Sequence, residues 1–497
     1  MRGGITPAIA ALAAWAVLLA PGPIEAQAPD RSAPPELGPP PRFDVPLIQH
    51  FQLANGLEVM LMEMHEVPLM QVNLLLEAGS IADPDDRKGL ASMVAAMLDE
   101  GAGDRDALEI ADEIDYLGAA LGVSAGDHTT VVQLHTPLAQ LDPALEIMAD
   151  VVLRPIFPAE ELERQRIERL TELLQWRDEP DAIASVAFSE TLYGDDHPYG
   201  VPEIGTAQGL ESITPEDLSA YHRSRFVPGD ATLIVVGDVT REAIAPQLET
   251  AFGGWRGAAV LETAIPPVEQ VEARRIYLVD KPGAEQSEIR IGRIGVPRLT
   301  EDYYAIVVMN TILGGSFTSR LNQNLREDKG YSYGAGSAFD FRPGPGPFIA
   351  GAAVQTDVTA EALTEFMMEL RGILEAVSQA ELERARNYLA LGFPQEFQTV
   401  AGTAGMLGEL ALYDLPDETF DRHIERIEAV TVEDVQRVAR QYLDPEKVAI
   451  IVVGDRSVIE APVRALNLGP VEDLTIEQVL GPPPVITPGE DPAPAAP

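Results

Sequence analysis

Apolar runs of strand length recur in the first half of the chain. Residues 57–64 and 69–77 are rich in Leu, Val and Met, and residues 128–136 read HTTVVQLHT. Runs of this length and composition are typical of β-strands. The sequence therefore predicts strands in these three segments and a fourth at 231–236, where an uninterrupted apolar run follows Pro228.

Helical spacing of apolar residues lies between and after these strands. In residues 88–100 the apolar side chains recur three, four, seven and eight positions apart, which places them on one buried stripe. Thr214 opens another helical stretch and is followed three residues later by Asp217, which is nearly a capping box. The predicted helices cover residues 88–100, 106–117, 139–152, 158–176 and 214–225.

The order of these elements indicates the fold class. Strands come in runs that are mixed with helices, and they do not alternate one by one with them. That order favours an α+β fold built in layers, in which helices pack on one face of a sheet.

The second half of the chain repeats the first. Residues 213–218 (ITPEDL) lead into an apolar run that ends in Gly-Asp at position 238, and residues 430–435 (VTVEDV) lead into the same arrangement at position 455. The offset between the two copies is the same at both of these matched points. A period this long indicates two copies of a whole domain, because solenoid repeats are far shorter.

A second repeated motif and the proline-rich segments indicate the expected domain limits. The sequence ELER at 161–164 returns at 381–384, with nearly the same offset as the first repeat. Pro266 and Pro267 interrupt any periodic pattern between the copies. The expected organisation is a signal peptide at 1–28, a Pro-rich linker at 29–46, a first domain at 47–256, a linker at 257–273, a second domain at 274–470 and a Pro-rich tail at 471–497.

Charge and composition narrow the possible functions. The 497 residues include 79 acidic and 35 basic side chains, which gives a net charge of −44. Such a charge repels phosphate backbones and anionic lipid, so nucleic-acid binding and electrostatic membrane docking are not expected. The chain has no cysteine, which excludes disulfides, thiol nucleophiles and cysteine zinc ligands.

The N-terminus has the features of a secretory signal. Arg2 gives the positive start, an apolar Ala-rich stretch of about 16 residues follows, and small residues allow cleavage after Ala26 or Ala28. The stretch is short for a membrane span, although an uncleaved anchor stays the alternative. We therefore expect an exported protein, periplasmic or secreted, with no membrane span after cleavage.

Four segments together resemble the insulinase/pitrilysin metallopeptidases, in particular the branch similar to mitochondrial processing peptidase. The resemblance covers about residues 47–470 and implies two homologous peptidase-like domains in a clamshell-like assembly. Each motif is weak alone, and the joint pattern is specific. The segments are 79–101 around the predicted helix, the HPYG run at 197–206, the 228–238 strand, and 312–321 in the second copy.

The zinc signature of that family is absent from the matching helix. Members of the family carry His-x-x-Glu-His there, and the matching positions hold Ser92, Ala95 and Ala96. Glu172 matches the family's third ligand best. A catalytic zinc needs three protein ligands and a carboxylate to take the proton of its water, so we expect no zinc in this chain.

No other set of histidines is expected to replace that site. The seven histidines include no pair three or four residues apart, so no helix presents two of them together. His128 and His135 are an odd number of residues apart on the predicted strand and should face opposite sides. His197 lies in a loop, where capping or solvation is a more common role than metal binding.

The second copy retains a different part of the family's active site. Residues 319–333 are predicted to form a helix that ends at Gly330 in a left-handed cap and continues into a strand. The resemblance implies that Arg326 and Tyr333, with Tyr331 as the fallback, reach into a zinc-bearing half and hold the substrate. A guanidinium can donate to a peptide carbonyl, and a phenol to a developing oxyanion. The alternative is structural: Arg326 at a helix end and Tyr333 in the core.

These features lead to one hypothesis and two alternatives. The resemblance implies a non-zinc subunit that binds peptide and completes the active site of a partner chain carrying His-x-x-Glu-His and zinc. The first alternative is an inactive structural or assembly protein of the cell envelope, similar to the peptidase-like core subunits of respiratory complexes. The second, an independent enzyme using Ser92, is weak because no activating base lies near it in sequence. The sequence identifies neither the peptide nor the partner, and it leaves a homodimer open.

Overall fold

A computed structural model describes residues 45–257 and 263–486. The predicted signal peptide at 1–28 lies outside these residues, as do most of the 29–46 linker and the end of the tail. Within the described ranges, no helix is both long and apolar enough to cross a membrane.

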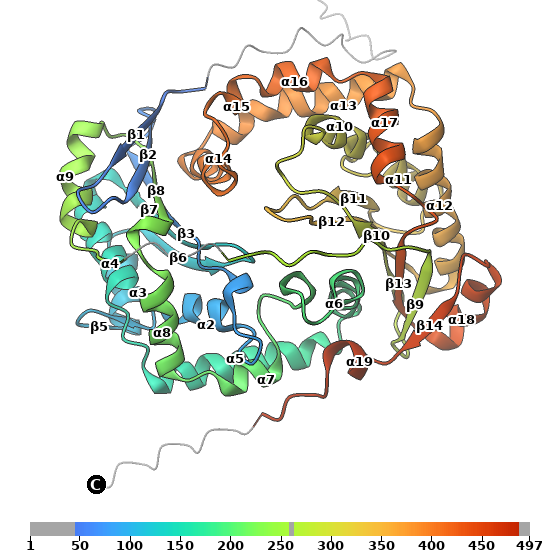
Figure 1. Ribbon diagram of the computed structural model, residues 1–497, viewed down its shortest axis with the longest axis horizontal. Coiled ribbons are helices and arrows are strands. Elements are labelled where there is room, and N and C mark those ends of the chain that lie inside the picture. The colour runs from blue at the N-terminus through green and yellow to red at the C-terminus, as the bar shows by residue number, and fades with distance from the viewer. Residues whose placement is uncertain (1–44, 258–262, 487–497) are drawn as a thin grey trace, which may run out of the picture. The chain divides into compact units, whose positions relative to one another are not determined.

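The first half forms a six-stranded mixed sheet (Figure 1). Its strands follow the order β1-β2-β8-β3-β7-β6, in which β2 and β8 are parallel and the other neighbours are antiparallel. The bounds are β1 Ile48–Gln52, β2 Glu58–Glu63, β3 Leu69–Leu76, β6 Ala120–Ala125, β7 Thr130–Pro137 and β8 Ala231–Gly237.

The second half forms another six-stranded sheet of the same topology, in the order β11-β12-β10-β13-β9-β14. In this sheet β13 and β9 are parallel, as β8 and β2 are, and β13 is antiparallel to β10 as β8 is to β3. One edge differs, because β14 joins β9 in parallel whereas β1 joins β2 antiparallel. The bounds are β9 Arg275–Asp280, β10 Gln286–Ile294, β11 Gly336–Phe339, β12 Pro347–Gln355, β13 Ala449–Gly454 and β14 Val471–Leu474.

Helices of the first half cover one face of the first sheet. Val72 and Leu74 of β3 lie in one buried cluster with Met93, Met148 and Leu248, which come from α2, α4 and α9. The helices are α2 Leu90–Met97, α3 Ala107–Tyr116, α4 Leu141–Leu153, α5 Ala159–Trp176, α6 Pro180–Tyr193, α7 Ala207–Ser212, α8 Pro215–Arg225 and α9 Arg241–Phe252, and the short ribbon β4 Gly101–Ala102 with β5 Arg105–Asp106 precedes α3.

The second sheet has an equivalent cover. Ile289 and Ile291 of β10 pack with Met309, Phe366 and Val438, which come from α10, α12 and α17. The predicted fold class, two sheets each with helices packed on one face, is therefore confirmed. The helices are α10 Tyr303–Leu313, α11 Arg320–Asn322, α12 Thr359–Glu375, α13 Gln379–Gly392, α14 Val400–Tyr413, α15 Glu418–Asp421, α16 His423–Ala429, α17 Val432–Tyr442, α18 Arg456–Ala465 and α19 Ile476–Leu480.

The predicted repeat is visible in the caps as well as in the strands. Thr214 and Asp217 form a capping box at the start of α8, and Thr431 and Asp434 form the same box at the start of α17. Each box satisfies two backbone groups of a first turn that would otherwise lack partners. The helix pairs α5–α6 and α13–α14 are related by the same offset as the two ELER segments, which lie in α5 and α13.

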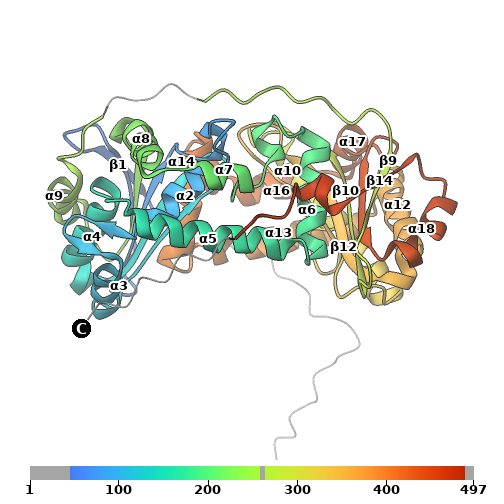
Figure 2. The same cartoon turned by 90° about the horizontal axis from the view of Figure 1, so that it is seen from below.

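One helix of each half also packs on the sheet of the other half. On β2, Val59 and Leu61 face the first half's own helices, while Met60 and Met62 join a cluster with Leu407 of α14. Figures 1 and 2 both show α14 beside the first sheet, although it belongs to the second half. The equivalent α6 packs through Phe188 on the second sheet. Both faces of the central strands are buried, so they read as continuous apolar runs.

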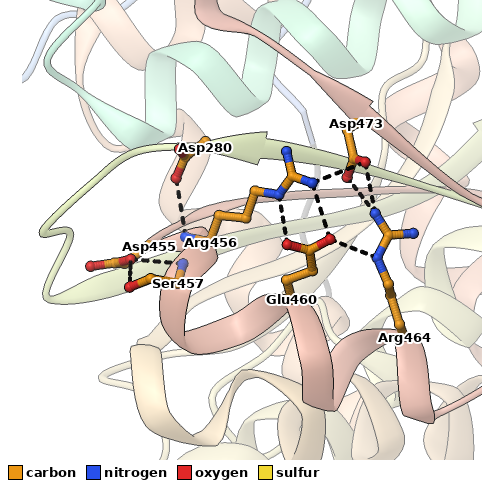
Figure 3. Close-up of polar contacts among 7 residues, drawn as sticks. All are labelled: Asp280, Asp455, Arg456, Ser457, Glu460, Arg464 and Asp473. Atoms are coloured by element: carbon orange, nitrogen blue, oxygen red, sulfur yellow. Dashed lines mark hydrogen bonds and ion pairs between the residues drawn. The ribbon is translucent and has the colours of Figure 1, made fainter.

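An ion-pair network holds the edge strand β14 to α18. Glu460 accepts hydrogen bonds from Arg456 and Arg464, both at 2.9 Å, and Arg464 donates two bonds of 2.7 Å to Asp473 of β14 (Figure 3). The two guanidinium groups lower the pKa of Glu460 to about 2. The network is exposed, so it aligns the edge strand more than it stabilises the fold.

Asp83 fixes the start of α2, the helix that matches the missing zinc motif. Its carboxylate accepts hydrogen bonds from the backbone N–H groups of Gly89 and Ala91, both at 2.8 Å. Gly89 has a φ of 98° and lies against the backbone of Ile204, where a Cβ atom would approach the carbonyl oxygen to 2.4 Å. Burial raises the pKa of Asp83 to about 6, although those N–H groups oppose the shift.

We predict that Asp83→Ala lowers the free energy of unfolding by about 2–3 kcal/mol, because two buried N–H groups lose their acceptor. Urea unfolding followed by circular dichroism would measure the change. Asp85→Ala is the matched control, since the Asp85 side chain is 98% exposed and should change stability by less than about 0.5 kcal/mol. Equal stability of the two variants would contradict the capping role.

Candidate functional site

The structure brings two of the four degenerate zinc-motif positions to one pocket. Ser92 on α2 and Glu172 on α5 both line a pocket of about 460 Å³, whereas Ala95 and Ala96 do not line it. Ala95 is buried at 3% exposure, and Ala96 is partly buried. The remaining lining residues are Gln165, Glu168, Arg169, Trp176, Glu203 and Ile204.

Arg169 reaches from α5 to α2 across this pocket. Its Nη1 donates to the Ser92 hydroxyl at 2.7 Å, and its Nη2 donates to the Ser92 carbonyl oxygen at 3.0 Å. Its Nε is buried and has no hydrogen-bond partner among the residues that the structure describes. Burial lowers the pKa of Arg169, and the carboxylates of Glu172 and Glu168 partly offset this effect.

The residues of this pocket do not fit a catalytic zinc ion. Ser92 and Ala96 stand where the family has histidines, and Ala95 stands where it has the glutamate that activates water. Glu172 is the single carboxylate left of the expected set, and a guanidinium already lies beside Ser92. Zinc sites need three protein ligands, so no step of a zinc mechanism can be assigned to this chain.

Arg169 is a residue that sequence reasoning missed. It precedes Glu172 by three positions, so both lie on one face of α5. The sequence did show a basic residue one helical turn from the position that matches the third zinc ligand. It could not show that the side chain of this residue turns toward α2.

The described residues contain no group of three or more His, Asp or Glu side chains arranged to hold a metal. His197 is buried and has a capping role, since its Nδ1 accepts from the backbone N–H of Tyr199 at 3.0 Å and its Nε2 lies 3.1 Å from the carbonyl oxygen of Pro266. His128 precedes β7 instead of lying in it, and its Nε2 lies 2.6 Å from the Tyr199 hydroxyl. His135 bonds Gln71 instead.

Arg326 lies in a wide turn of helix in the second half. Residues Gln323–Asp328 form a π-helical turn, in which the N–H of Lys329 donates to the carbonyl of Asn324 at 3.0 Å, five residues back. The guanidinium lies over the Phe317 ring at 4.6 Å and pairs with Glu327 at 3.3 Å. Such turns occur often at functional sites, because the extra residue redirects the side chains.

The two candidate tyrosines have different surroundings. Tyr333 is 92% exposed, which contradicts the structural alternative that it fills the core. Tyr331 is partly buried against the core of the second half, and its backbone N–H closes the turn on Leu325 at 2.8 Å. Gly330 has a φ of 67°, which confirms the predicted left-handed cap. Of the two, Tyr333 is thus the one free to reach a ligand.

The two parts of the expected active site do not meet within this chain. No hydrogen bond or ion pair in the described ranges joins Arg326 or Tyr333 to Ser92 or Glu172. Arg326 contacts Phe317 and Tyr333 precedes Gly334, and these two neighbours line a second pocket of about 850 Å³.

A partly buried polar cluster joins the two halves near the first sheet. Arg342 pairs with Asp127 at 2.6 Å and with Asp340 at 2.7 Å, and its guanidinium lies 4.5 Å from the centre of the Tyr199 ring. Burial, aided by the charge of Arg342, lowers the pKa of the adjacent His128 to about 4. The cluster is thus built around a neutral imidazole and one cation.

We predict that His128 and His423 destabilise the protein as the pH falls from 6.5 toward 4, whereas the raised pKa of Asp83 acts in the opposite direction. Burial lowers the pKa of His128 and of His423 to about 4 each, below the 6.5 of the unfolded chain. The unfolded state therefore binds protons first, at a cost of about 1–2 kcal/mol per histidine between pH 7 and pH 5. Urea unfolding at both pH values should show a smaller loss for H128Q/H423Q than for the natural chain, and an unchanged loss would contradict the assignment.

Comparison with protein families places both halves in one group. The family model described as insulinase (peptidase family M16) matches residues 58–200, and the model described as peptidase M16 inactive domain matches residues 212–389. Together they cover all strands of the first sheet except β1, and β9 to β12 of the second sheet, and the inactive-domain match includes Arg326.

Relatives of similar length extend the match over most of the chain. An uncharacterized zinc protease of Mycobacterium tuberculosis is 27% identical over 394 residues, 79% of this chain and 90% of that protein. An uncharacterized zinc protease of Bacillus subtilis is 25% identical over 400 residues, 80% and 95% of the two chains.

Solved structures share the fold. A peptidase M16 inactive domain protein from Pseudomonas fluorescens is 28% identical with a TM-score of 0.76, over 82% of this chain and 98% of that one. A protease from Helicobacter pylori has a TM-score of 0.75 at 21% identity, over 82% and 100% of the two chains, and shows the likeness of fold alone.

Proposed function

The chain belongs to the insulinase family, peptidase family M16, and on that premise we propose that it is the non-zinc subunit of a two-chain metallopeptidase. In this proposal it binds a peptide through the segment of Arg326 and Tyr333, and a partner chain with an intact His-x-x-Glu-His motif supplies the zinc and the activated water.

One contrast carries the proposal. The first half has Ser92, Ala95 and Ala96 where the family has its two zinc-binding histidines and its catalytic glutamate. The second half exposes Tyr333 and holds Arg326 near an open pocket. A chain that kept neither part would fit a purely structural role. A chain that binds substrate but cannot activate water needs a partner for catalysis.

The charge of the chain favours one class of substrate. A net charge of −44 attracts basic, extended peptides and repels acidic ones. In the complex, Arg326 would donate to a peptide carbonyl, and the Tyr333 hydroxyl would donate to the oxygen that gains negative charge during attack. Both groups would act on the partner's reaction centre.

Reconstitution tests the proposal. The purified chain, a zinc-bearing insulinase-family chain from the same cell, and their mixture would be assayed with a quenched fluorescent basic peptide, and the metal content of each chain would be measured. We expect this chain alone to be inactive and the mixture to be much more active than the partner alone. Hydrolysis by the isolated chain, or a mixture no faster than the partner, would overturn the proposal.

A structural role in an envelope complex is the competing function. It predicts stable association with a non-peptidase complex and no effect on peptide hydrolysis, so the same mixtures separate the two hypotheses. Both hypotheses rest on the expected export of the chain, which N-terminal sequencing of the mature protein would test through cleavage after Ala26 or Ala28.

A further inference from the structure

We infer that Arg169 takes the place of the metal in the first half, so that restoring the lost ligands does not by itself restore zinc binding. The inference rests on the proposed function, because it explains why this half needs a zinc-bearing partner. It concerns the isolated chain, however, and can fail while the two-chain proposal stands.

The position of the guanidinium is the first argument. It donates through Nη1 to the side chain of Ser92 and through Nη2 to the main chain of the same residue. Ser92 is the position that matches the first histidine of the family motif. Glu172, which matches the third ligand, lines the same pocket one turn further along α5. The guanidinium thus lies in the pocket that is lined by Ser92 and Glu172, two of the four positions that match the motif.

The charges around the pocket are the second argument. Glu168, Glu172 and Glu203 all line it, and such a set favours a cation. Arg169 supplies that positive charge from within the chain. A divalent ion that entered would meet a guanidinium in a partly desolvated site, where repulsion between like charges is stronger than in water.

The direction of the Arg169 side chain distinguishes its proposed role from that of an ordinary surface ion pair. A residue three positions before a glutamate on an exposed helix would usually pair with it. In the described part of the chain Arg169 has no ion pair with Glu172 or Glu168, and its donors reach α2 instead. Arg164 on the same helix shows the ordinary arrangement, since it pairs with Glu161 and Glu100 and is 51% exposed.

Metal binding by three variants tests the inference. S92H/A95E/A96H restores the motif beside Glu172, and the same variant with R169A also removes the guanidinium. We expect the version with R169A to bind zinc about 100-fold more tightly, measured by competition with a chelator of known affinity. The triple variant with R164A is the matched control and should bind as weakly as the triple variant. Equal zinc affinity with and without Arg169, or equal rescue by R164A, would overturn the inference.

A second measurement decides the matter if the redesigned variants do not fold. R169A alone, in the natural sequence, should melt at a lower temperature than the natural chain and regain stability on addition of low millimolar ethylguanidinium. R164A should show no such rescue. An R169A chain that is as stable as the natural one, or that ethylguanidinium does not stabilise, would show that no cation is needed in this pocket and would overturn the inference.

Discussion

Arg326→Ala is expected to lower the kcat/KM of the reconstituted two-chain peptidase by about 100-fold, the usual effect of losing one donor to the transition state. The guanidinium is half exposed and is held by the Phe317 ring and by Glu327, so its removal leaves no buried group without a partner. The loss should therefore appear in peptide hydrolysis while the melting temperature stays nearly constant. Tyr333→Phe, which removes only an exposed hydroxyl, should act in the same direction.

Arg371→Ala is the control for this experiment. Arg371 also lies in the second half and is 48% exposed, and it pairs with Glu446 away from the pocket near Arg326. It should leave hydrolysis unchanged. Full activity of a mixture that contains the double variant R326A/Y333F would disprove the role assigned to this segment and would leave a structural role as the better hypothesis.

Arg342→Ala is expected to lower the free energy of unfolding by about 3–5 kcal/mol, the cost of leaving a buried carboxylate without its cation. Arg342 lies between Asp127 and Asp340, and the Asp127 side chain is only 14% exposed. Burial already raises the pKa of Asp127 despite the opposing charge of Arg342. Without the guanidinium, the two carboxylates and Glu203 would repel one another.

A double-mutant cycle isolates this effect. D127N/R342A should be less destabilised than R342A in urea unfolding, because the neutral amide needs no counter-charge. Arg422→Ala is the surface control, since Arg422 is 58% exposed and lies 3.9 Å from Glu425. A loss in R342A no larger than in R422A would show that the cluster contributes little to the joining of the halves.

Much of the fold could be predicted from local sequence patterns. The helices at 158–176 and 214–225 are found as α5 and α8, and the Thr214 capping box is present. The long sequence repeat corresponds to two sheets of matching topology. These features depend on contacts between residues close in sequence or on the duplication, and both can be recognised in one sequence.

Other features depend on contacts that are distant in sequence. The continuous apolar run at 231–236 predicted the strand β8, but not that α14 covers β8, and α6 covers β13, from the opposite half. The π-helical turn at Arg326 needs one extra residue between two hydrogen-bonded turns, and no residue type specifies it.

Only part of the candidate site could be predicted, because some of its contacts also join residues that are distant in sequence. The loss of ligands at Ser92, Ala95 and Ala96 could be read directly from the motif. The contact of Arg169 with Ser92 joins residues 77 positions apart, so it required the structure.

The exchange of α6 and α14 has a consequence for how the duplicated chain can be divided. A break in the 257–273 linker would yield two fragments, each with an uncovered apolar sheet face and with one helix whose apolar side chains have lost their packing partner. Neither fragment would make a soluble product by itself, whereas the two produced together should reassemble noncovalently. We therefore expect the duplicated chain to unfold as one cooperative unit, in which the half without metal ligands is still required because it covers the sheet of the other half.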